Sequence, residues 1–448
     1  MTEFNQQETL TQLHKLLASK SMHEIPDLLF TMHPAEIADF LENLPSKSRD
    51  LVWEGINAEH RSSILTHLHG AVRSEFLGQM GPQEVSAATE EMEADDAADI
   101  IQELPDAVQD TVLRSMDAQN RLRLTSVLSY SEHTAGGLMN IDIIPIRADA
   151  SLDVVIRYLK QLDNIPQKTD HLIVVDRANH YLGDLSIFDI LLADPKQKVA
   201  ELITEAVAIP CDLSDTEVAK LFEQQDLVSV AVVNSDNLLL GRITIDDVVD
   251  VIQEEAEHTV RSLVGLGEDD MFGPTINSAK RRAIWLGINL ATAFLAAWVI
   301  GVFAETIEQM VALAVLLPVV ASMGGISGTQ TLTITIRGIA LSQLDKNNFI
   351  SLIFKEVSVA FLNGLVWAVL IAIVTILWFK NIVLGGIIGL AIMINFLVAA
   401  FFGVVIPFTL KRYNIDPAIA GGVLLTTVTD VVGFLLFLGL AAWLLVVS

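Results

Sequence analysis

The sequence predicts a multidomain membrane protein: an N-terminal all-α superhelical domain, two tandem α+β modules, a connecting helix and a transmembrane domain of five α-helices. Three observations predict this fold class. Charge is divided unevenly along the 448 residues, since residues 1–279 hold 19 Lys and Arg against 49 Asp and Glu, whereas residues 280–448 hold 9 against 6. The first part contains internal repeats, and the second contains long apolar spans. A soluble part is therefore expected to precede a membrane part.

The net charge of the two parts indicates which classes of binding partner are expected. The soluble part has a net charge of −30 and the membrane part +3, which argues against nucleic acid and anionic lipid and favours cations. A purely solubilising surface is the alternative. The one cysteine, Cys211, excludes an intramolecular disulfide and fits a reducing compartment. The N-terminus lacks the apolar core of a signal peptide, so the soluble part is expected to stay in the cytoplasm.

Residues 1–130 have the apolar spacing of short helices, with apolar residues three and four apart. The segment ADFLENLP at 38–45 resembles ADIIQELP at 98–105, and both copies end in proline. Pro34 and Pro82 are expected to open neighbouring helices. Stacked helical hairpins in a superhelix follow from this repeat.

Residues 131–200 and 201–252 are predicted to form two copies of one module. HLIVVDRANHYLGDLSIFDIL at 171–191 aligns with SVAVVNSDNLLLGRITIDDVV at 229–249, an offset of 58 residues, and each copy is expected to run strand, helix, two strands, helix. Both copies contain G-x-x-[ST]-x-x-D, whose hydroxyl and carboxylate can either cap a helix or bind a ribose. The residues concerned are Ser186, Asp189, Thr244 and Asp247.

Residues 253–279 are predicted to form the connecting helix and a linker, and residues 280–448 the transmembrane domain. Its apolar spans are 283–304, 311–336, 352–379, 382–410 and 418–447, each long enough to cross about 30 Å of hydrocarbon. Nearly all flanking Lys and Arg fall on one side of these spans. The positive-inside rule then places the soluble part in the cytoplasm and the C-terminus outside.

Asp430 lies in the middle of the last span, where a charge costs at least ~2.5–3.5 kcal/mol. Gly422, Thr426, Asp430 and Gly433 share one helix face, and Thr427 flanks it. We expect this face to coordinate a cation in a water-filled path. The alternative is an acid that packs between helices and is held neutral.

The second span has Pro318, Gly324, Gly325 and Gly328 within an otherwise apolar run. These residues predict a broken helix, and non-helical backbone at this depth is tolerated only against protein or water. The span is therefore expected to line a permeation path. Close contacts between helices are the alternative explanation of the small residues.

Carboxylates cluster at helical spacing in the soluble part. One group is Glu91, Glu93, Asp95, Asp96 and Asp99; another is Asp246, Asp247, Asp250, Glu254, Glu255 and Glu257, with Asp226 and Asp236 in the second module. Because like charges this dense repel, divalent cations with oxygen ligands are expected to compensate them. A solvated acidic face is the alternative. No Ser–His–Asp set, P-loop or dinucleotide fingerprint stands out, so no enzymatic activity is expected.

Three segments carry a resemblance to a known family. They are SEHTAGGLMN at 131–140, which leads into the two modules, LPVVASMGGISGTQTLTITIRG at 317–338, and PAIAGGVLLTTVTD at 417–430. With these segments the chain resembles the MgtE family of magnesium channels and transporters over nearly its whole length. The modules look like tandem CBS domains, and the two membrane segments are similar to the family's second transmembrane helix and to its fifth-helix motif, which ends in the pore aspartate. The chain departs from the family at Ile326, where Asn is common, and at residues 421–423, where Ser-Gly-Pro is common.

The resemblance implies a homodimeric, multi-pass Mg²⁺-selective channel or transporter for magnesium uptake across a bacterial inner membrane, with its pore on the twofold axis. It also implies gating by intracellular Mg²⁺ bound to the acidic domains. The implied pore residues are Asp430, Thr426, Thr427 and Gly422. The implied regulatory metal residues are Asp226, Asp247, Asp250, Glu255, Glu59, Asp95 and Asp99. Asp247 also resembles a nucleotide ligand, so ATP is a candidate regulatory ligand alongside Mg²⁺.

Two other functions stay open. One is transport of Co²⁺ or Mn²⁺, against which stands the lack of soft Cys, Met or His ligands near Asp430. The other is a membrane receptor in which the CBS pair senses an adenine nucleotide, against which stand the intramembrane acid and the interrupted second span. The expected partners are a second copy of the chain, the lipid bilayer and divalent cations, and not nucleic acid.

Overall fold

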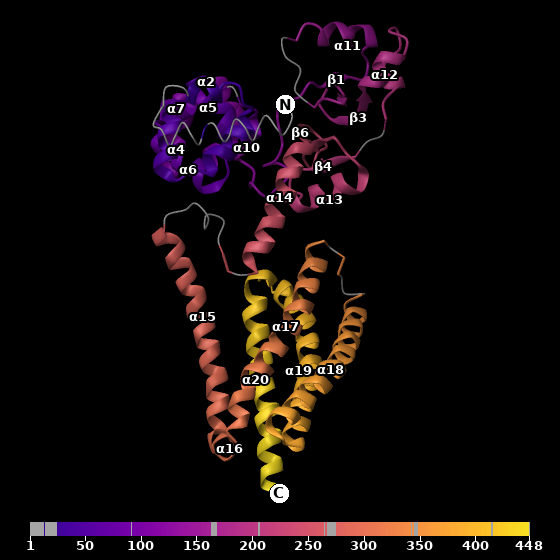
Figure 1. Ribbon diagram of the computed structural model, residues 1–448. Helices are drawn as coiled ribbons and strands as arrows, with labels where there is room; N and C mark the ends of the chain where they lie inside the picture. The colour runs from indigo at the N-terminus through magenta and orange to yellow at the C-terminus, as the bar shows by residue number, and fades with distance from the viewer. Residues whose placement is uncertain are drawn as a thin grey trace. The chain divides into compact units, whose positions relative to one another are not determined.

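The structure is a computed structural model that describes residue 13 and residues 25–90, 92–162, 168–204, 207–263, 265–266, 275–341, 343–344, 348–413 and 415–447. The chain divides into two compact units, Met1–Ala256 and Glu257–Ser448 (Figure 1). The first holds the helical domain and the two α+β modules, and the second holds the long apolar helices. The predicted fold class is confirmed.

Short helices fill the described part of the N-terminal domain. They are α2 (Ile25–Leu29), α3 (Pro34–Glu42), α4 (Ser46–Glu54), α5 (Ala58–Leu65), α6 (Gly70–Gln79), α7 (Pro82–Thr89), α8 (Ala94–Gln102), α9 (Asp106–Ser115) and α10 (Ala118–Leu128). Pro34 and Pro82 open α3 and α7 as predicted, since proline has the φ of a first helical turn and needs no hydrogen-bond partner there. Pro45 and Pro105 are the N-caps of α4 and α9, so the sequence repeat is a structural repeat.

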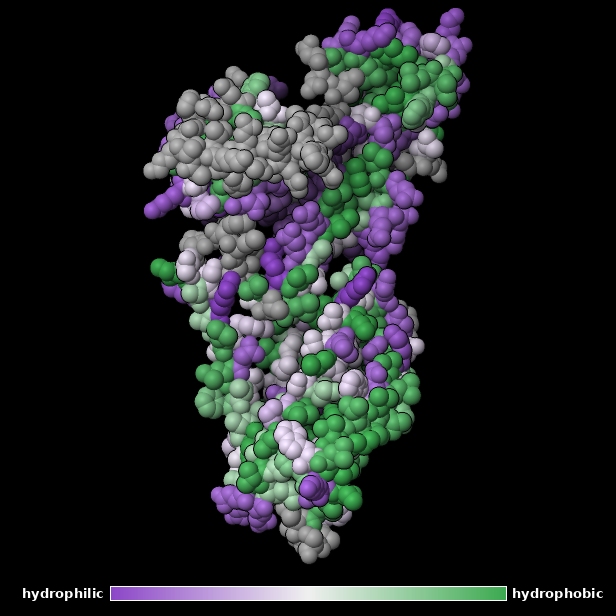
Figure 2. All heavy atoms as spheres, in the orientation of Figure 1, coloured by the Kyte–Doolittle hydropathy of each residue, from purple (hydrophilic) through white to green (hydrophobic). Residues whose placement is uncertain are grey.

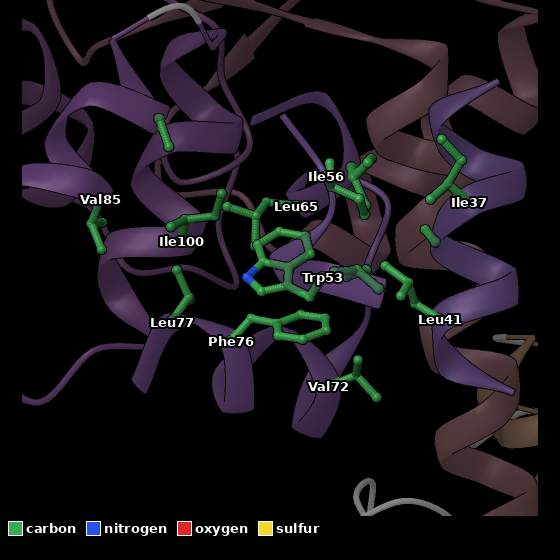
Figure 3. Close-up of a cluster of buried hydrophobic side chains, with 14 of the residues drawn as sticks. Ile37, Leu41, Trp53, Ile56, Leu65, Val72, Phe76, Leu77, Val85 and Ile100 are labelled. Carbon is green, nitrogen blue, oxygen red and sulfur yellow. The ribbon is translucent and has the colours of Figure 1, made fainter. Parts of the chain in front are cut away.

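One apolar core runs through these helices (Figure 3). Trp53 of α4 and Phe76 of α6 stack at its centre, with ring centroids 4.1 Å apart and planes 14° apart. Leu41 of α3, Leu65 of α5 and Ile100 of α8 belong to the same cluster and are fully buried. None of these helices is longer than 11 residues, so packing against the shared core, rather than helix propensity, stabilises them.

Two equivalent modules follow. The first contains β1 (Ile146–Arg147), α11 (Leu152–Leu159), β2 (His171–Val175), β3 (Tyr181–Ser186), α12 (Ile187–Leu192) and the 3₁₀ helix η2 (Val199–Glu201); the second contains β4 (Ala208–Pro210), α13 (Asp215–Gln225), β5 (Ser229–Val233), β6 (Leu239–Thr244) and α14 (Ile245–Ser262). In each sheet the first strand pairs parallel to the second and the second antiparallel to the third. A register shift falls between Val174 and Val175 and, 58 residues later, between Val232 and Val233. The predicted order and offset are confirmed.

The β2–β3 hairpin and the β5–β6 hairpin donate equivalent backbone hydrogen bonds to each other, as two copies related by a local twofold axis would. Asn179 and Asn237 occupy the equivalent turns with φ of 69° and 60°, a left-handed conformation that asparagine tolerates. The Tyr181 N–H donates to the Asn237 carbonyl at 3.0 Å, and the Leu239 N–H donates to the Asn179 carbonyl at 3.1 Å. The two modules are therefore joined by their backbones as well as by side chains.

The connecting helix continues the last helix of the second module. Helix α14 runs without a break from Ile245 to Ser262. The reason is in the sequence, which contains no Gly or Pro between Ile245 and Gly265. Of the linker predicted at 267–282, residues 267–274 lie outside the described residues, and the remainder is wrong because helix α15 (Thr275–Val302) begins at Thr275.

The membrane unit contains α15 (Thr275–Val302), α16 (Ala304–Gln309), α17 (Ala312–Ala340), α18 (Phe349–Phe379), α19 (Ile382–Arg412) and α20 (Pro417–Val447). Among the described residues, five helices are long and apolar enough to cross a membrane, all but α16 of this set. On the face shown in Figure 2, apolar residues cover these helices. The five predicted spans are confirmed.

The prediction of a broken second span is wrong. Helix α17 is continuous from Ala312 to Ala340 and includes Pro318. Gly324 and Gly328 are buried against α19 and α20, where they allow close approach: a Cβ on Gly328 would lie 3.0 Å from Leu425. These small residues serve helix packing, which was the alternative explanation.

Phe76→Ala should destabilise the N-terminal domain by about 3–5 kcal/mol, because it removes one ring of the stacked pair and leaves a cavity. Hydrogen exchange of the α4 and α6 amides in the full chain measures this loss locally. Phe30→Ala is the matched control, since Phe30 is 72% exposed, and should change the same protection by no more than about 0.5 kcal/mol. Equal losses for the two variants would contradict the central place of the Trp53–Phe76 stack.

Candidate functional site

Three of the four residues that the sequence placed on one face of α20 are partly exposed, whereas the fourth, Gly433, is buried against Asn395 and Val320. Gly422, Thr426 and Asp430 follow one another at intervals of four residues and are all partly exposed. The Thr426 hydroxyl donates to the Gly422 carbonyl at 3.0 Å, and the Thr427 hydroxyl donates to the Val423 carbonyl at 2.6 Å. Each hydroxyl hydrogen is thus directed into the helix, which leaves the oxygen lone pairs to accept from water or bind a cation. Among the described residues, no hydrogen bond or ion pair engages the Asp430 carboxylate.

The helix α17 carries a second polar face. An open groove of about 790 Å³ lies along it, lined by Ser322, Gly325, Ile326, Thr329, Gln330, Thr333 and Ile334. The Thr329 hydroxyl donates to the Gly325 carbonyl at 2.9 Å, so it also presents its lone pairs outward. These side chains are exposed in a single copy of the chain. A polar strip on an apolar helix needs water or another polar surface beside it.

Sequence reasoning assigned no role to Glu356, yet the structure buries it. Its side chain, on α18, is 5% exposed; it accepts from the Thr331 hydroxyl at 3.3 Å and pairs with Lys355 at 3.3 Å. A signal was present in the sequence: Glu356, Ala360, Gly364 and Ala368 recur every four residues and form the buried stripe of α18. Lys355 is thereby engaged by Glu356, and within the described part of the chain no ion pair joins a cation to Asp430.

In the first unit, carboxylates gather where α8 meets the second module. Asp95 is 7% exposed, and its Oδ1 has no hydrogen-bond partner among the described residues. Glu93 accepts from Asn140 Nδ2 at 2.6 Å, which ties the start of α8 to the segment leading into the modules. Asp247, at the start of α14, accepts from the Thr244 N–H at 3.1 Å. The structure thus brings together acids that are about 150 residues apart in sequence.

The acids of this cluster resist ionisation. Burial, then the nearby charge of Asp247, raises the pKa of Asp95 well above its usual range. Burial and the charge of Glu93 raise the pKa of Asp96 to about 6, and burial raises the pKa of Asp99 to about 7 although Arg73 opposes the shift. Burial likewise raises the pKa of Asp247 to about 6. Such a cluster favours protons or hard cations beside it.

The other predicted regulatory residues lie apart from this cluster or are not described. Asp226 is the exposed, left-handed C-cap of α13, and Glu255 is exposed on α14. Asp250 is exposed one turn beyond Asp247 and acts on Asp96 through its charge. The side chain of Glu59 and all of Glu91 lie outside the described residues. Within the described part, no three His, Cys, Asp or Glu side chains are arranged to hold one metal ion.

The G-x-x-[ST]-x-x-D pattern caps helices in both modules. The Ser186 hydroxyl accepts from the Phe188 N–H at 3.2 Å at the start of α12. In the second module Asp247 Oδ2 accepts from both the Thr244 N–H and its hydroxyl. Asp189 lies in the first turn of α12. Capping of the backbone accounts for two of the four residues, Ser186 and Asp247, in this conformation.

A buried histidine sits between the modules, unpredicted by the sequence reading. The His171 side chain is 14% exposed, with Nδ1 3.0 Å from Asp170 Oδ1 and Nε2 3.3 Å from Asp184 Oδ2. Only an imidazolium can donate to both carboxylates. Burial lowers the pKa of His171, but the hydrogen bond to Asp170 and the charges of Asp184 and Asp170 outweigh it and raise that pKa overall. Asp170 is the main partner, because its pKa is lowered whereas burial raises the pKa of Asp184.

Comparison with known proteins agrees with this geometry. The MgtE family model, described as a divalent cation transporter, matches residues 317–440, and the model of the MgtE intracellular N domain matches residues 32–133. The CBS domain model matches residues 135–196 and 199–254.

The chain belongs to the MgtE family.

Among MgtE relatives, the magnesium transporter MgtE of Bacillus subtilis is 28% identical over 97% of each chain. That of Thermus thermophilus is 28% identical and covers 91% of this chain and 95% of its own. A crystal structure of the cytosolic domain of the Mg²⁺ channel MgtE in complex with ATP is 27% identical, with a TM-score of 0.50; it covers 54% of this chain and 99% of that one. The groove of α17 and the polar face of α20 both fall within the stretch matched by the MgtE transporter model.

His171→Asn should destabilise this MgtE protein more at pH 6 than at pH 9. Because the folded-state pKa of His171 is raised above its ordinary 6.5, its contribution is full below that value and is lost as the pH rises through the folded-state pKa. Thermal unfolding of the detergent-solubilised full chain at the two pH values measures the difference. Thr89→Ala, which removes a buried neutral donor 3.0 Å from the Val85 carbonyl, is the control and should cost the same at both. A loss for His171→Asn that is equal at pH 6 and pH 9 would exclude the imidazolium.

Proposed function

We propose that the chain conducts Mg²⁺ through its membrane unit, with Asp430 in the path. The observation that carries the proposal is the partly exposed carboxylate of Asp430 in the middle of a membrane-spanning helix. It has no protein partner among the described residues. The hydroxyl oxygens of Thr426 and Thr427 beside it can accept hydrogen bonds or bind a cation. A charge at this depth needs water or a cation. The names of the MgtE relatives, which are magnesium transporters, support the choice of ion.

The chemistry of Mg²⁺ suits such a face. The ion holds oxygen ligands octahedrally at about 2.0–2.1 Å and dehydrates reluctantly, so it usually keeps several waters. One carboxylate with threonine and carbonyl oxygens can therefore bind it through those waters. Such binding is weak enough for release, as conduction requires.

A second copy of the chain would complete the path. The groove of α17 leaves a polar strip exposed in one copy, and a homodimer would place it against an equivalent surface. Two Asp430 carboxylates facing one ion on a twofold axis would match its charge of +2. The membrane is proposed to be a bacterial plasma membrane, with the soluble part in the cytoplasm and the C-terminus outside.

The acidic cluster is proposed to sense intracellular Mg²⁺. The buried, unpartnered Oδ1 of Asp95 and the raised pKa values of Asp95 and Asp247 fit a hard cation in the same place. The described acids are not grouped as a three-ligand site, so waters or further groups would complete the coordination. Only an ion that binds the closed state more tightly can close the path.

ATP is proposed as a further ligand of the CBS modules. The related cytosolic domain was solved with ATP. The residues in question, Ser186, Asp189, Thr244 and Asp247, lie at equivalent positions of the two modules. Since Asp247 also belongs to the acidic cluster, nucleotide and metal would meet in one neighbourhood.

Asp430→Asn should reduce Mg²⁺ uptake into proteoliposomes by about tenfold or more, since it removes the path's charge while keeping its shape. Fluorescent detection of Mg²⁺ inside the vesicles measures uptake, and size-exclusion chromatography checks assembly. Glu305→Gln is the control: it makes the same charge change at an exposed position of α16 and should leave uptake near the parent rate. Parent-like uptake by Asp430→Asn would remove Asp430 from the path.

Asp95→Asn combined with Asp247→Asn should weaken inhibition of uptake by Mg²⁺ on the cytoplasmic side. The expected result is about a tenfold higher inhibitory concentration, because two charged ligands are lost from the sensor. Patch recording with varied cytoplasmic Mg²⁺ measures it. Asp106→Asn with Asp110→Asn, on the exposed face of α9, controls for net charge. An unchanged inhibitory concentration in the Asp95/Asp247 variant would refute a sensor at this cluster.

A further inference from the structure

A fully buried carboxamide lies at the junction of three membrane helices. Asn395 of α19 has a relative exposure of 0%. Its Nδ2 donates to the Val320 carbonyl of α17 at 3.4 Å, a long hydrogen bond. Among the described residues, no donor reaches its Oδ1. An unpaired acceptor in an apolar interior is destabilising, so packing alone would favour an apolar residue of this size.

Two glycines make room for this carboxamide. A Cβ on Gly324 of α17 would lie 2.2 Å from Nδ2 of Asn395, and a Cβ on Gly433 of α20 would lie 2.7 Å from the same atom. Both distances are far below any van der Waals contact, so only glycine fits either position. The carboxamide of α19 is therefore wedged between the backbones of α17 and α20.

The wedge lies next to the proposed ion path. Gly433 is three residues from Asp430, about 4.5 Å along the axis of α20. Gly324 precedes Gly325, which lines the groove of α17. Asn395 itself does not face that groove, since it is fully buried. It touches the two helices that carry the path's polar faces at the height of the carboxylate.

We propose that Asn395 is a positioning residue that sets ion selectivity, by fixing the distance and rotation of α20 against α17 and hence the position of the Asp430 carboxylate. This inference rests on the proposed function of these helices. The ligand class is a hydrated divalent cation. Mg²⁺ demands a near-ideal octahedral shell, whereas Ca²⁺ accepts larger and less regular ones. A carboxylate held at a fixed distance from the facing groove discriminates between them, and one that is free to shift does not.

Asn395→Leu is the principal test, because leucine keeps the branching of the side chain at Cγ but cannot donate to Val320. We expect assembly like that of the parent, together with a ratio of Ca²⁺ to Mg²⁺ uptake raised about tenfold in proteoliposomes. A merely structural asparagine predicts a parent-like ratio, and that result would overturn the proposal. Gly386→Ala is the control, since a Cβ at this position of α19 meets open space, and its ratio should be that of the parent.

A paired variant keeps the proposal testable if Asn395→Leu fails to fold. Gly433→Ala alone should clash with Asn395 and lower thermal stability. Asn395→Ala with Gly433→Ala should recover that stability, because the new methyl group occupies space that the carboxamide vacates. A raised Ca²⁺ to Mg²⁺ ratio in the recovered double variant supports the proposal; a parent-like ratio refutes it. Failure of the proposed path itself is distinguished by Asp430→Asn, whose uptake would then equal the parent's.

Discussion

The membrane unit depends on how each carboxylate in the hydrocarbon layer is compensated. A charge there is destabilising unless water, a proton, a cation or a hydrogen bond offsets it. Glu356 is offset by the protein, through Thr331 and Lys355. Asp430 is not offset by any described residue, although threonine oxygens accompany it. This difference distinguishes Glu356, which joins two helices, from Asp430, which is proposed to face the ion path.

The need to compensate buried carboxylates also applies outside the membrane helices, at the start of α8. Burial there raises the pKa of several acids, and their mutual repulsion adds to the effect. Asp247 Oδ2 already accepts a hydrogen bond from the Thr244 N–H at the helix start. Oδ1 of Asp95 has no hydrogen-bond partner among the described residues. A cation that binds unpaired acids in the folded state stabilises that state, so its stability depends on the cation concentration. The proposed sensing and the proposed conduction thus depend on the same chemistry, the compensation of carboxylate charge, at two places.

Sequence reasoning succeeded wherever local pattern decides structure. The 58-residue offset located both modules and their strands, and proline positions located helix starts. Sequence reasoning failed where the role of a residue depends on a contact with a residue far away in the sequence. The glycines of α17 suggested a break, but Gly324 and Gly328 make room for Asn395 and Leu425, which lie on other helices. The sequence allowed Glu356 to pair with its neighbour Lys355, but it did not show that Glu356 is buried against Thr331 of another helix. His171 was missed although Asp170 precedes it in sequence, because Asp184 comes close to its other ring nitrogen only when β2 pairs with β3.

The matching turns at Asn179 and Asn237 point to duplication of an ancestral gene segment. Since the duplication, equivalent positions have diverged: His171 corresponds to Ser229, and Asp184 to Arg242. The copies therefore keep one backbone geometry but enclose opposite charges, since Asp184 is 8% and Arg242 5% exposed. Because each buried charge needs its own partners, a side chain of one copy cannot replace its counterpart in the other without leaving a charge unpaired.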